Sequence, residues 1–169
     1  MAKGLGYAIE ELVPHRPPMI LIDRLLEATE TRAVALVRVD EGSLFLGSEG
    51  VPAYVGIEYM AQTIAAHGGY LSRQKGEPVK TGFLLGTPKM TCAEPFFEMG
   101  ATLRIEVEKE WGDDQLMRFL CAIFDHNSGE RLQYAALNVL QPNDLQEFLD
   151  QKHHGGKGGK GAESMGAKP

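Results

Sequence analysis

The sequence predicts an α+β fold in which a curved antiparallel sheet wraps one long helix. The main observation is a proline-free apolar segment from Tyr54 to about Arg73, long enough for a helix of about five turns. Segments with the composition and alternation of strands lie before and after it. A helix that is apolar nearly all round must be enclosed by the rest of the protein. One broad, curved antiparallel sheet provides that cover.

The chain before this helix is expected to start with a short helix over residues 7–11. A proline-rich extended segment over residues 14–19 follows, because proline and the residue before it disfavour helix. Apolar and β-branched residues then predict strands over residues 20–22 and 32–39. Glycine and proline punctuate residues 40–52, which are therefore expected to form the loop that leads into the long helix.

The chain after the helix has a β pattern over most of its length. Strands are expected over residues 81–91, 101–110, 115–125 and 130–140, and the last three are expected to form an antiparallel meander joined by tight turns. A short helix over residues 143–151 is expected to follow. A long helix wrapped by such a sheet is the hot-dog architecture, which usually dimerises by joining two sheets edge to edge and so hides exposed strand edges.

Residues 1–151 are predicted to form one domain, and residues 152–169, rich in glycine and lysine, to be a disordered tail. The chain of 169 residues is 43% hydrophobic and 24% charged, as in globular proteins, and its net charge of −6 argues against nucleic-acid binding. No segment resembles a signal peptide or a membrane span. Cys92 and Cys121 are expected to be buried thiols in a reducing compartment, with a disulfide as the alternative, so a cytoplasmic location is expected.

Glu58 is the strongest candidate for a functional residue. It is the only acidic residue between Val51 and Gly76, and it lies near the start of the apolar helix. An isolated carboxylate is costly to bury as an anion, although a helix N-terminus favours negative charge. Gln62, one turn later, lies on the same face and is expected to hydrogen-bond the carboxylate. The alternative is a solvent-exposed glutamate that caps backbone amides in the first helical turn.

Two segments resemble known signatures. Residues 14–24, PHRPPMILIDR, and residues 58–62, EYMAQ, look like the two signatures of FabZ-like 3-hydroxyacyl-[acyl-carrier-protein] dehydratases, which have the hot-dog fold. A proline six residues before the helix carboxylate also matches. Residues 55–62, VGIEYMAQ, and residues 82–87, GFLLGT, more specifically resemble the dehydratase-like proteins of bacterial aryl polyene clusters. The resemblance extends over about residues 10–150.

The resemblance implies elimination of water from a 3-hydroxyacyl chain held as a thioester on acyl carrier protein. It implies no metal or redox cofactor, since the phosphopantetheine arm arrives with the substrate, and it implies a homodimer or a heterodimer with another hot-dog subunit. In the family, a loop histidine and a helix carboxylate from opposite subunits move the protons, and amides at the helix N-terminus polarise the thioester carbonyl. Glu58 occupies the carboxylate position here. The expected substrate-binding residues are Ala53, Tyr54 and Val55 by their amides, with Gln62 and Pro14.

The family's catalytic histidine has no counterpart in its usual loop. The corresponding residues 44–52 are shorter and contain no histidine. His15 is the leading replacement, because the family's histidine at this position lines the mouth of the substrate tunnel; the alternative is that its imidazole braces the turn before the first strand. His67 lies nine residues beyond Glu58, about 13 Å along the helix, which is too far for the same proton transfer unless the copy in the other subunit takes part.

The sequence therefore favours a dehydratase acting on carrier-bound 3-hydroxyacyl chains, with Glu58 and His15 as its acid and base. Arg16 and Lys89 are candidate contacts for the acidic carrier protein. One alternative is an acyl-thioesterase in which Glu58 activates water or attacks directly. Another is a non-catalytic subunit that stabilises an active partner. The missing loop histidine favours this last reading, and the retained Glu58 counts against it.

Overall fold

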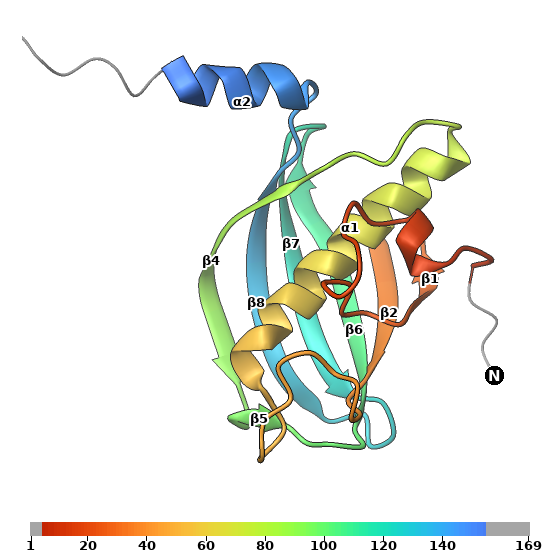
Figure 1. Ribbon diagram of the computed structural model, residues 1–169, viewed down its shortest axis with the longest axis vertical. Helices are drawn as coiled ribbons and strands as arrows, with labels where there is room; N and C mark the ends of the chain where they lie inside the picture. Colours follow the sequence, from red (N-terminus) through yellow and green to blue (C-terminus); the bar gives the residue numbers. More distant parts are fainter. Residues whose placement is uncertain (1–4, 155–169) are drawn as a thin grey trace, which may run out of the picture.

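The computed structural model describes residues 5–154, and its central feature is one long helix held against a curved sheet (Figure 1). Helix α1 (Gly56–Gln74) lies across a six-stranded sheet in which all neighbouring strands are antiparallel, in the order β1-β2-β6-β7-β8-β4. The predicted α+β hot-dog fold is confirmed. The strands of this sheet are β1 (Arg24–Ala28), β2 (Arg32–Arg38), β4 (Phe83–Cys92), β6 (Thr102–Gly112), β7 (Leu116–Asp125) and β8 (Arg131–Leu140).

Several short elements complete the fold. A 3-10 helix, η1 (Ile9–Glu11), replaces the slightly longer helix expected over residues 7–11. A second 3-10 turn, η2 (Ala53–Val55), runs directly into α1. Strands β3 (Val51–Pro52) and β5 (Phe96–Phe97) pair with each other. Neither was predicted, because two residues are too few to show an alternating pattern.

The C-terminal helix is longer than expected. Helix α2 (Leu145–His154) continues past residue 151, where the predicted domain ends. Asp144 caps it, since its Oδ1 accepts a hydrogen bond from Glu147 N at 2.9 Å. The rest of the predicted tail, residues 155–169, lies outside the described residues.

The strand predicted over residues 20–22 is wrong, because β1 begins only at Arg24. A turn closed by the hydrogen bond from Met19 N to Arg16 O, 2.9 Å, precedes this segment, and it contains a cis peptide between Pro17 and Pro18. Beyond the turn, Leu21 N donates to a glutamine side chain of α1 instead of to a strand. Backbone groups bonded to a side chain do not enter a sheet ladder, so the apolar residues alone gave a false strand signal.

The core lies between α1 and the concave face of the sheet. Tyr59, Met60 and Ile64 of the helix are buried against inward-facing side chains of the strands, such as Ile105 and Leu137. Each large apolar side chain removed from water contributes roughly 1.5–3 kcal/mol to stability. This packing holds the helix against the sheet, and it therefore also sets where the side chains of the helix begin.

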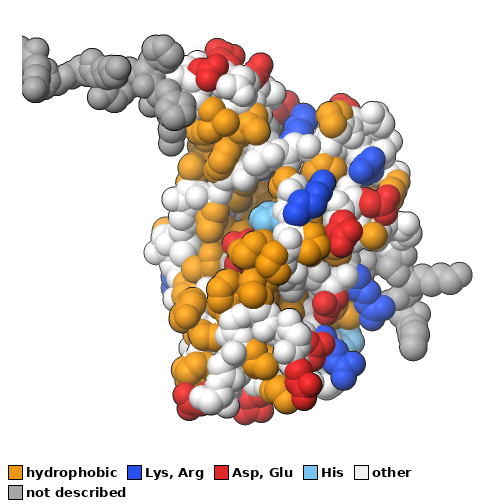
Figure 2. All heavy atoms as spheres, in the orientation of Figure 1, with side chains coloured by type: hydrophobic (Ala, Val, Ile, Leu, Met, Phe, Trp, Pro, Cys, Tyr) orange, Lys and Arg blue, Asp and Glu red, His pale blue; other side chains and the backbone are white. Residues whose placement is uncertain are grey.

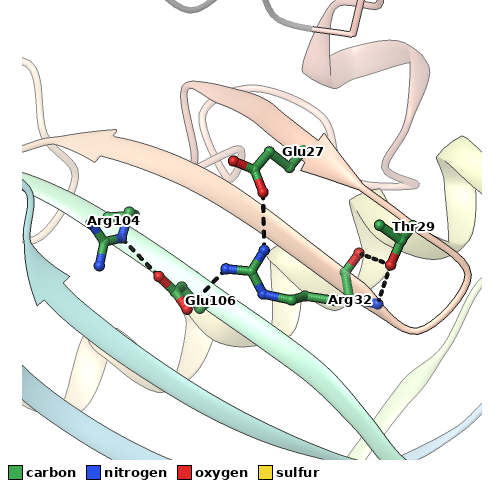
Figure 3. Close-up of polar contacts among 5 residues, drawn as sticks. All are labelled: Glu27, Thr29, Arg32, Arg104 and Glu106. Carbon is green, nitrogen blue, oxygen red and sulfur yellow. Dashed lines mark hydrogen bonds and ion pairs between the residues drawn. The ribbon is translucent and has the colours of Figure 1, made fainter.

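The outer face of the sheet carries an ion-pair chain across three strands (Figure 3). Arg32 of β2 bonds Glu27 of β1 at 2.9 Å and Glu106 of β6 at 3.1 Å, and Glu106 also accepts from Arg104 at 2.8 Å. The hydrogen bond that Arg32 donates to Glu106 is the main cause that raises the pKa of Arg32 above its usual value. Exposed pairs of this kind each add about 0–1 kcal/mol, so this set of ion pairs contributes little to the stability of the fold.

Strand β4 is an edge of the sheet with apolar side chains in solvent. Leu84 is 41% and Leu85 56% exposed. Figure 2 shows hydrophobic side chains gathered over the hollow between α1 and β4. Cys92 at the end of β4 is exposed and Cys121 is buried, and both are free thiols, so the expectation of two buried thiols holds only for Cys121. Burial raises the pKa of the Cys121 thiol well above its usual value.

Candidate active site

The sequence-predicted residues Glu58, His15 and Gln62 meet near the N-terminus of α1, and we call them the Glu58 cluster. Gln62 Nε2 donates a hydrogen bond to Glu58 Oε1 at 2.8 Å. His15 Nε2 lies 3.5 Å from the same oxygen, and the two side chains are 31% and 37% exposed. This separation is slightly longer than a hydrogen bond, and both side chains are partly open to solvent, so the two groups are candidates for an acid–base pair.

Gln62 connects this pair to the rest of the fold. Its side chain is fully buried, and it also donates to Met19 O at 2.7 Å and accepts from Leu21 N at 2.8 Å. Every polar atom of the amide therefore has a partner, as burial requires. The predicted hydrogen bond between Gln62 and Glu58 is present, and the same amide anchors the segment that carries His15.

His15 is held by its own segment of chain. Arg16 Nη1 donates to the His15 carbonyl at 2.7 Å and to the Val13 carbonyl at 3.2 Å, so the arginine bonds backbone rather than a carboxylate. Pro14, half-buried, precedes the histidine. His15 Nδ1 is buried, and no hydrogen-bond partner for it occurs among residues 5–154. The other ring nitrogen, Nε2, is the one that faces the Glu58 carboxyl.

The three predicted amide donors at the helix N-terminus are not equivalent. Ala53 N already donates to Pro95 O at 2.8 Å. Gly56 N, at the end of the 3-10 turn, donates to Ala53 O. In a 3-10 helix each N–H points to the carbonyl three residues back, which directs Val55 N–H toward Pro52. The Tyr54 N–H precedes the first such bond, so the turn itself provides no carbonyl partner for it. The Tyr54 side chain is 68% exposed.

One residue near this turn was missed by the sequence analysis. Gln133 of β8 is only 1% exposed, and its Nε2 donates to Ala53 O at 2.9 Å. Its Oε1 is buried and has no hydrogen-bond partner within the described residues. The available signal was a glutamine at an inward-facing position of a strand whose neighbours on that face, Ala135 and Leu137, are apolar.

Other titratable candidates lie apart from this cluster. His67 is 3% exposed, contacts Thr29 O through Nε2 at 2.7 Å and packs edge-on against Phe119. Burial lowers its pKa below the usual value, so His67 is a neutral core residue. Asp23 Oδ2 accepts from Arg38 N, and burial is the main cause that raises its pKa.

Two cavities lie near the site but are not lined by Glu58 or His15. One, of about 150 Å³, is lined by Tyr59, Asp23 and residues 42–44 among others. Burial raises the pKa of Tyr59 to about 12, so this phenol is neutral at neutral pH. Another, of about 420 Å³, lies between β5 and the turn after β7 and carries five acidic side chains. Within residues 5–154 there is no group of three or more His, Cys, Asp or Glu that could hold a metal ion.

None of the helices in the described range is long and apolar enough to cross a membrane.

The two basic residues predicted to contact the carrier protein are both exposed. Arg16 lies beside His15, and Lys89 is exposed on β4. Neither forms an ion pair within residues 5–154, so both positive charges are available to a partner.

Comparisons with known proteins identify the family. The family model of ApeP-like proteins, described as ApeP dehydratase, matches residues 7–150. The chain is similar to the 3-hydroxyacyl-[acyl-carrier-protein] dehydratase FabZ of Acetivibrio thermocellus, with 32% identity over 106 residues that cover 59% of this chain and 70% of the relative.

Solved structures share the fold. The dehydratase heterocomplex ApeI:P from Xenorhabdus doucetiae superposes with a TM-score of 0.80 at 24% identity, covering 86% of this chain and 97% of that one. A hypothetical thioesterase with coenzyme A from Streptococcus pneumoniae is more distant, with a TM-score of 0.56 at 11% identity over 70% of this chain and 84% of that one. Because the family model spans most of the sequence, the chain belongs to the ApeP-like family of FabZ-like hot-dog dehydratases.

Proposed function

We propose that the protein eliminates water from a 3-hydroxyacyl thioester carried on acyl carrier protein, with Glu58 and His15 as its acid–base pair. The observation that carries this proposal is the 3.5 Å approach of His15 Nε2 to Glu58 Oε1 at the N-terminus of α1. Both groups are partly exposed, so both are within reach of a substrate. Proton transfer by positioned side chains typically accelerates a reaction by about 10²–10⁴-fold.

These two residues alone account for every proton that moves in the elimination. His15 takes the proton from C2 of the acyl chain, and the electrons of that C–H bond form the double bond to C3. The bond from C3 to oxygen breaks, and the oxygen takes a proton from Glu58 in its acid form and leaves as water. The proton on His15 then returns to Glu58 across their contact, which restores both groups. Negative charge that develops on the thioester oxygen is stabilised by the Tyr54 N–H at the helix N-terminus.

The partners follow from the same chemistry. The substrate would arrive on the phosphopantetheine arm of an acidic carrier protein, and Arg16 and Lys89 would attract that surface. The exposed leucines of edge strand β4 favour assembly with a second hot-dog subunit, either another copy or a different chain. The ApeI:P structure is named as a heterocomplex, which supports a heterodimer, and the ApeP-like family supports a role in aryl polyene synthesis.

The test is a product assay on a 3-hydroxyacyl-pantetheine thioester. The purified protein is incubated with this substrate alone and together with a second hot-dog dehydratase subunit, and both the enoyl product and free thiol are measured. Enoyl product without free thiol is expected. Thiol release without enoyl product would instead mean a thioesterase. Activity only in the presence of the partner would mean that the functional enzyme is a heterodimer.

If activity requires the partner, a further variant is needed to identify the subunit that carries the reacting residues. Glu58→Gln in this chain, assayed in the mixed complex, answers it. Loss of enoyl formation would place the reaction at the Glu58 cluster. Full activity of the mixed complex with Glu58→Gln would contradict the proposal and leave this chain as a stabilising subunit.

A further inference from the structure

We propose that Gln133 of β8 is a positioning residue that orients the Tyr54 N–H toward the substrate carbonyl. The inference rests on the proposed function, because it assigns a role within the same carbonyl-binding turn. Gln133 does not touch the Glu58 cluster; it acts on the peptide unit that precedes Tyr54, through the hydrogen bond from its Nε2 to Ala53 O at 2.9 Å.

The planar peptide unit between Ala53 and Tyr54 links the position of the carbonyl to that of the N–H. The carbonyl of Ala53 and the N–H of Tyr54 belong to one planar trans unit, so they point in opposite directions. A donor that holds the carbonyl on one side therefore fixes the direction of the N–H on the other. Donation to the carbonyl also polarises the peptide unit, which strengthens its N–H as a hydrogen-bond donor. Gly56 N donates to the same carbonyl from within the turn, so two donors hold it.

The packing around Gln133 supports a specific fit to this turn. A Cβ atom at Gly56 would overlap Gln133 Oε1 and come within 3.0 Å of Ile123 Cδ1. Only glycine at position 56 leaves room for the glutamine side chain to reach Ala53. Positions 56 and 133 thus fit each other across 77 residues of chain, at the point where the 3-10 turn becomes α1.

The orientation of the amide is set by its neighbours. Besides Ala53 O, the Nε2 atom is 3.0 Å from Cys92 Sγ and 3.5 Å from Met90 Sδ, which are both weak acceptors. The reversed amide would place Oε1 against the Ala53 carbonyl, two acceptors facing each other. The nitrogen therefore faces the carbonyl.

Stability alone does not explain the residue. Gln133 is 1% exposed, and its Oε1 has no hydrogen-bond partner within residues 5–154, which costs free energy in a buried position. The same inward face of β8 carries Ala135, Leu137 and Val139, so an apolar side chain would suit the core better. A buried polar group kept at a net cost, and bonded to the carbonyl-binding turn, fits a role in the reaction.

The first test is Gln133→Met, which keeps the length of the side chain and removes its donor. We expect kcat to fall by about 10–100-fold, less than for loss of a carbonyl-binding donor itself, with KM nearly unchanged and thermal stability equal or higher. The matched control is Asn138→Val. Asn138 lies on the same strand and also has a buried unpartnered oxygen, but no hydrogen bond joins it to the turn, so kcat should not change. A purely structural role for Gln133 would lower stability without changing kcat of the folded protein.

The second test is Gln133→Glu, which restores a donor only when the carboxyl is protonated. The activity of this variant relative to the wild type should rise as pH falls, because the protonated group donates to Ala53 O and the ionised group repels it. Gln133→Met should show no such recovery. An equal ratio at every pH would contradict the positioning role, and this comparison also serves if Gln133→Met fails to fold.

A readout that needs no turnover separates this inference from the proposed function. The backbone amide resonance of Tyr54 should shift in Gln133→Met and stay unchanged in Asn138→Val. If the wild type forms no enoyl product in any assembly, the proposed function fails, and a shifted Tyr54 resonance still supports the positioning of this amide. If the wild type is active while both kcat and the Tyr54 resonance are unchanged in Gln133→Met, the inference fails and the proposed function stands.

Discussion

The two ends of helix α1 use titratable side chains in opposite ways. At the N-terminal end, Glu58 is 37% exposed and faces His15 at 3.5 Å. In the C-terminal half, His67 is 3% exposed and contacts the carbonyl of Thr29 at 2.7 Å. Gln62 lies between these two residues, and its side-chain amide donates a hydrogen bond to Glu58.

The difference shows that exposure and partner decide what an ionisable group can do. His67 is enclosed by core side chains, so burial holds it neutral and nothing from solvent reaches it. His15 has one nitrogen near a carboxyl group and another without a partner among the described residues, and it is open to solvent on one side. Changes at the N-terminal end should therefore alter reaction rate, and changes at the C-terminal end should alter stability.

The largest expected effect is that of Glu58→Gln. Replacing the carboxyl by an amide keeps the shape of the side chain and removes its exchangeable proton, so kcat should fall by about 10²–10⁴-fold. Stability should change little, because the side chain is partly exposed. Steady-state kinetics and thermal unfolding on the same preparation measure both. A large loss of stability with unchanged kcat would make Glu58 a capping residue.

His15→Asn is expected to have the next largest effect. The amide retains polarity and loses the imidazole, so kcat should fall by about 10²-fold and the pH dependence of kcat/KM should lose one of its limbs. The pH profile of the variant against that of the wild type measures this. A variant with the wild-type profile would show that the imidazole only braces the turn that precedes β1.

Two adjacent glycines test the C-terminal end of the helix. A Cβ on Gly69 would overlap the carbonyl of Leu12, whereas the nearest atom to a Cβ on Gly68 is Gln141 Nε2 at 4.0 Å. Gly69→Ala should therefore destabilise the protein by about 1–3 kcal/mol. Gly68→Ala, the matched control, should be neutral or stabilise the helix by about 0.5–1 kcal/mol. Denaturant unfolding compares them, and equal effects would contradict the close contact between α1 and Leu12.

The smallest effect is the pH dependence that His67 imposes on stability. Burial lowers its folded-state pKa below the ordinary value of 6.5. Above pH 6.5 the imidazole is neutral in both states, and as pH falls below 6.5 the unfolded chain gains a proton that the folded protein does not take up. The free energy of unfolding should thus fall by at most about 1.4 kcal/mol per pH unit until the folded-state pKa is reached. His67→Gln should remove this part of the slope in unfolding curves measured at several pH values, and an unchanged slope would assign it to other groups.

The periodic parts of the fold were predictable from the sequence. The helix and the meander have strong apolar periodicities, and the bond from Gln62 to Glu58 follows from their spacing of one helical turn. The predicted strand over residues 20–22 is wrong for a physical reason. Its backbone is bonded to the side chain of Gln62, a long-range contact that no local pattern reveals.

The site was only partly predictable for the same reason. Family resemblance placed His15 near Glu58, but their contact depends on the turn closed between Arg16 and Met19. Gln133 and Ala53 are 80 residues apart, and their pairing depends on the register of β8, which fixes the side chains that face the helix. A single glutamine in an alternating strand pattern indicates a polar side chain that faces the helix, but it does not indicate which residue that side chain contacts.

A double-mutant cycle on Glu58 and His15 tests the paired site most directly. The values of kcat/KM for the wild type, Glu58→Gln, His15→Asn and the double variant are measured in whichever assembly forms the enoyl product. If the two residues act as one acid–base pair, the double variant should be no slower than the slower single variant. Losses that multiply, or a His15→Asn variant as fast as the wild type, would contradict the pair.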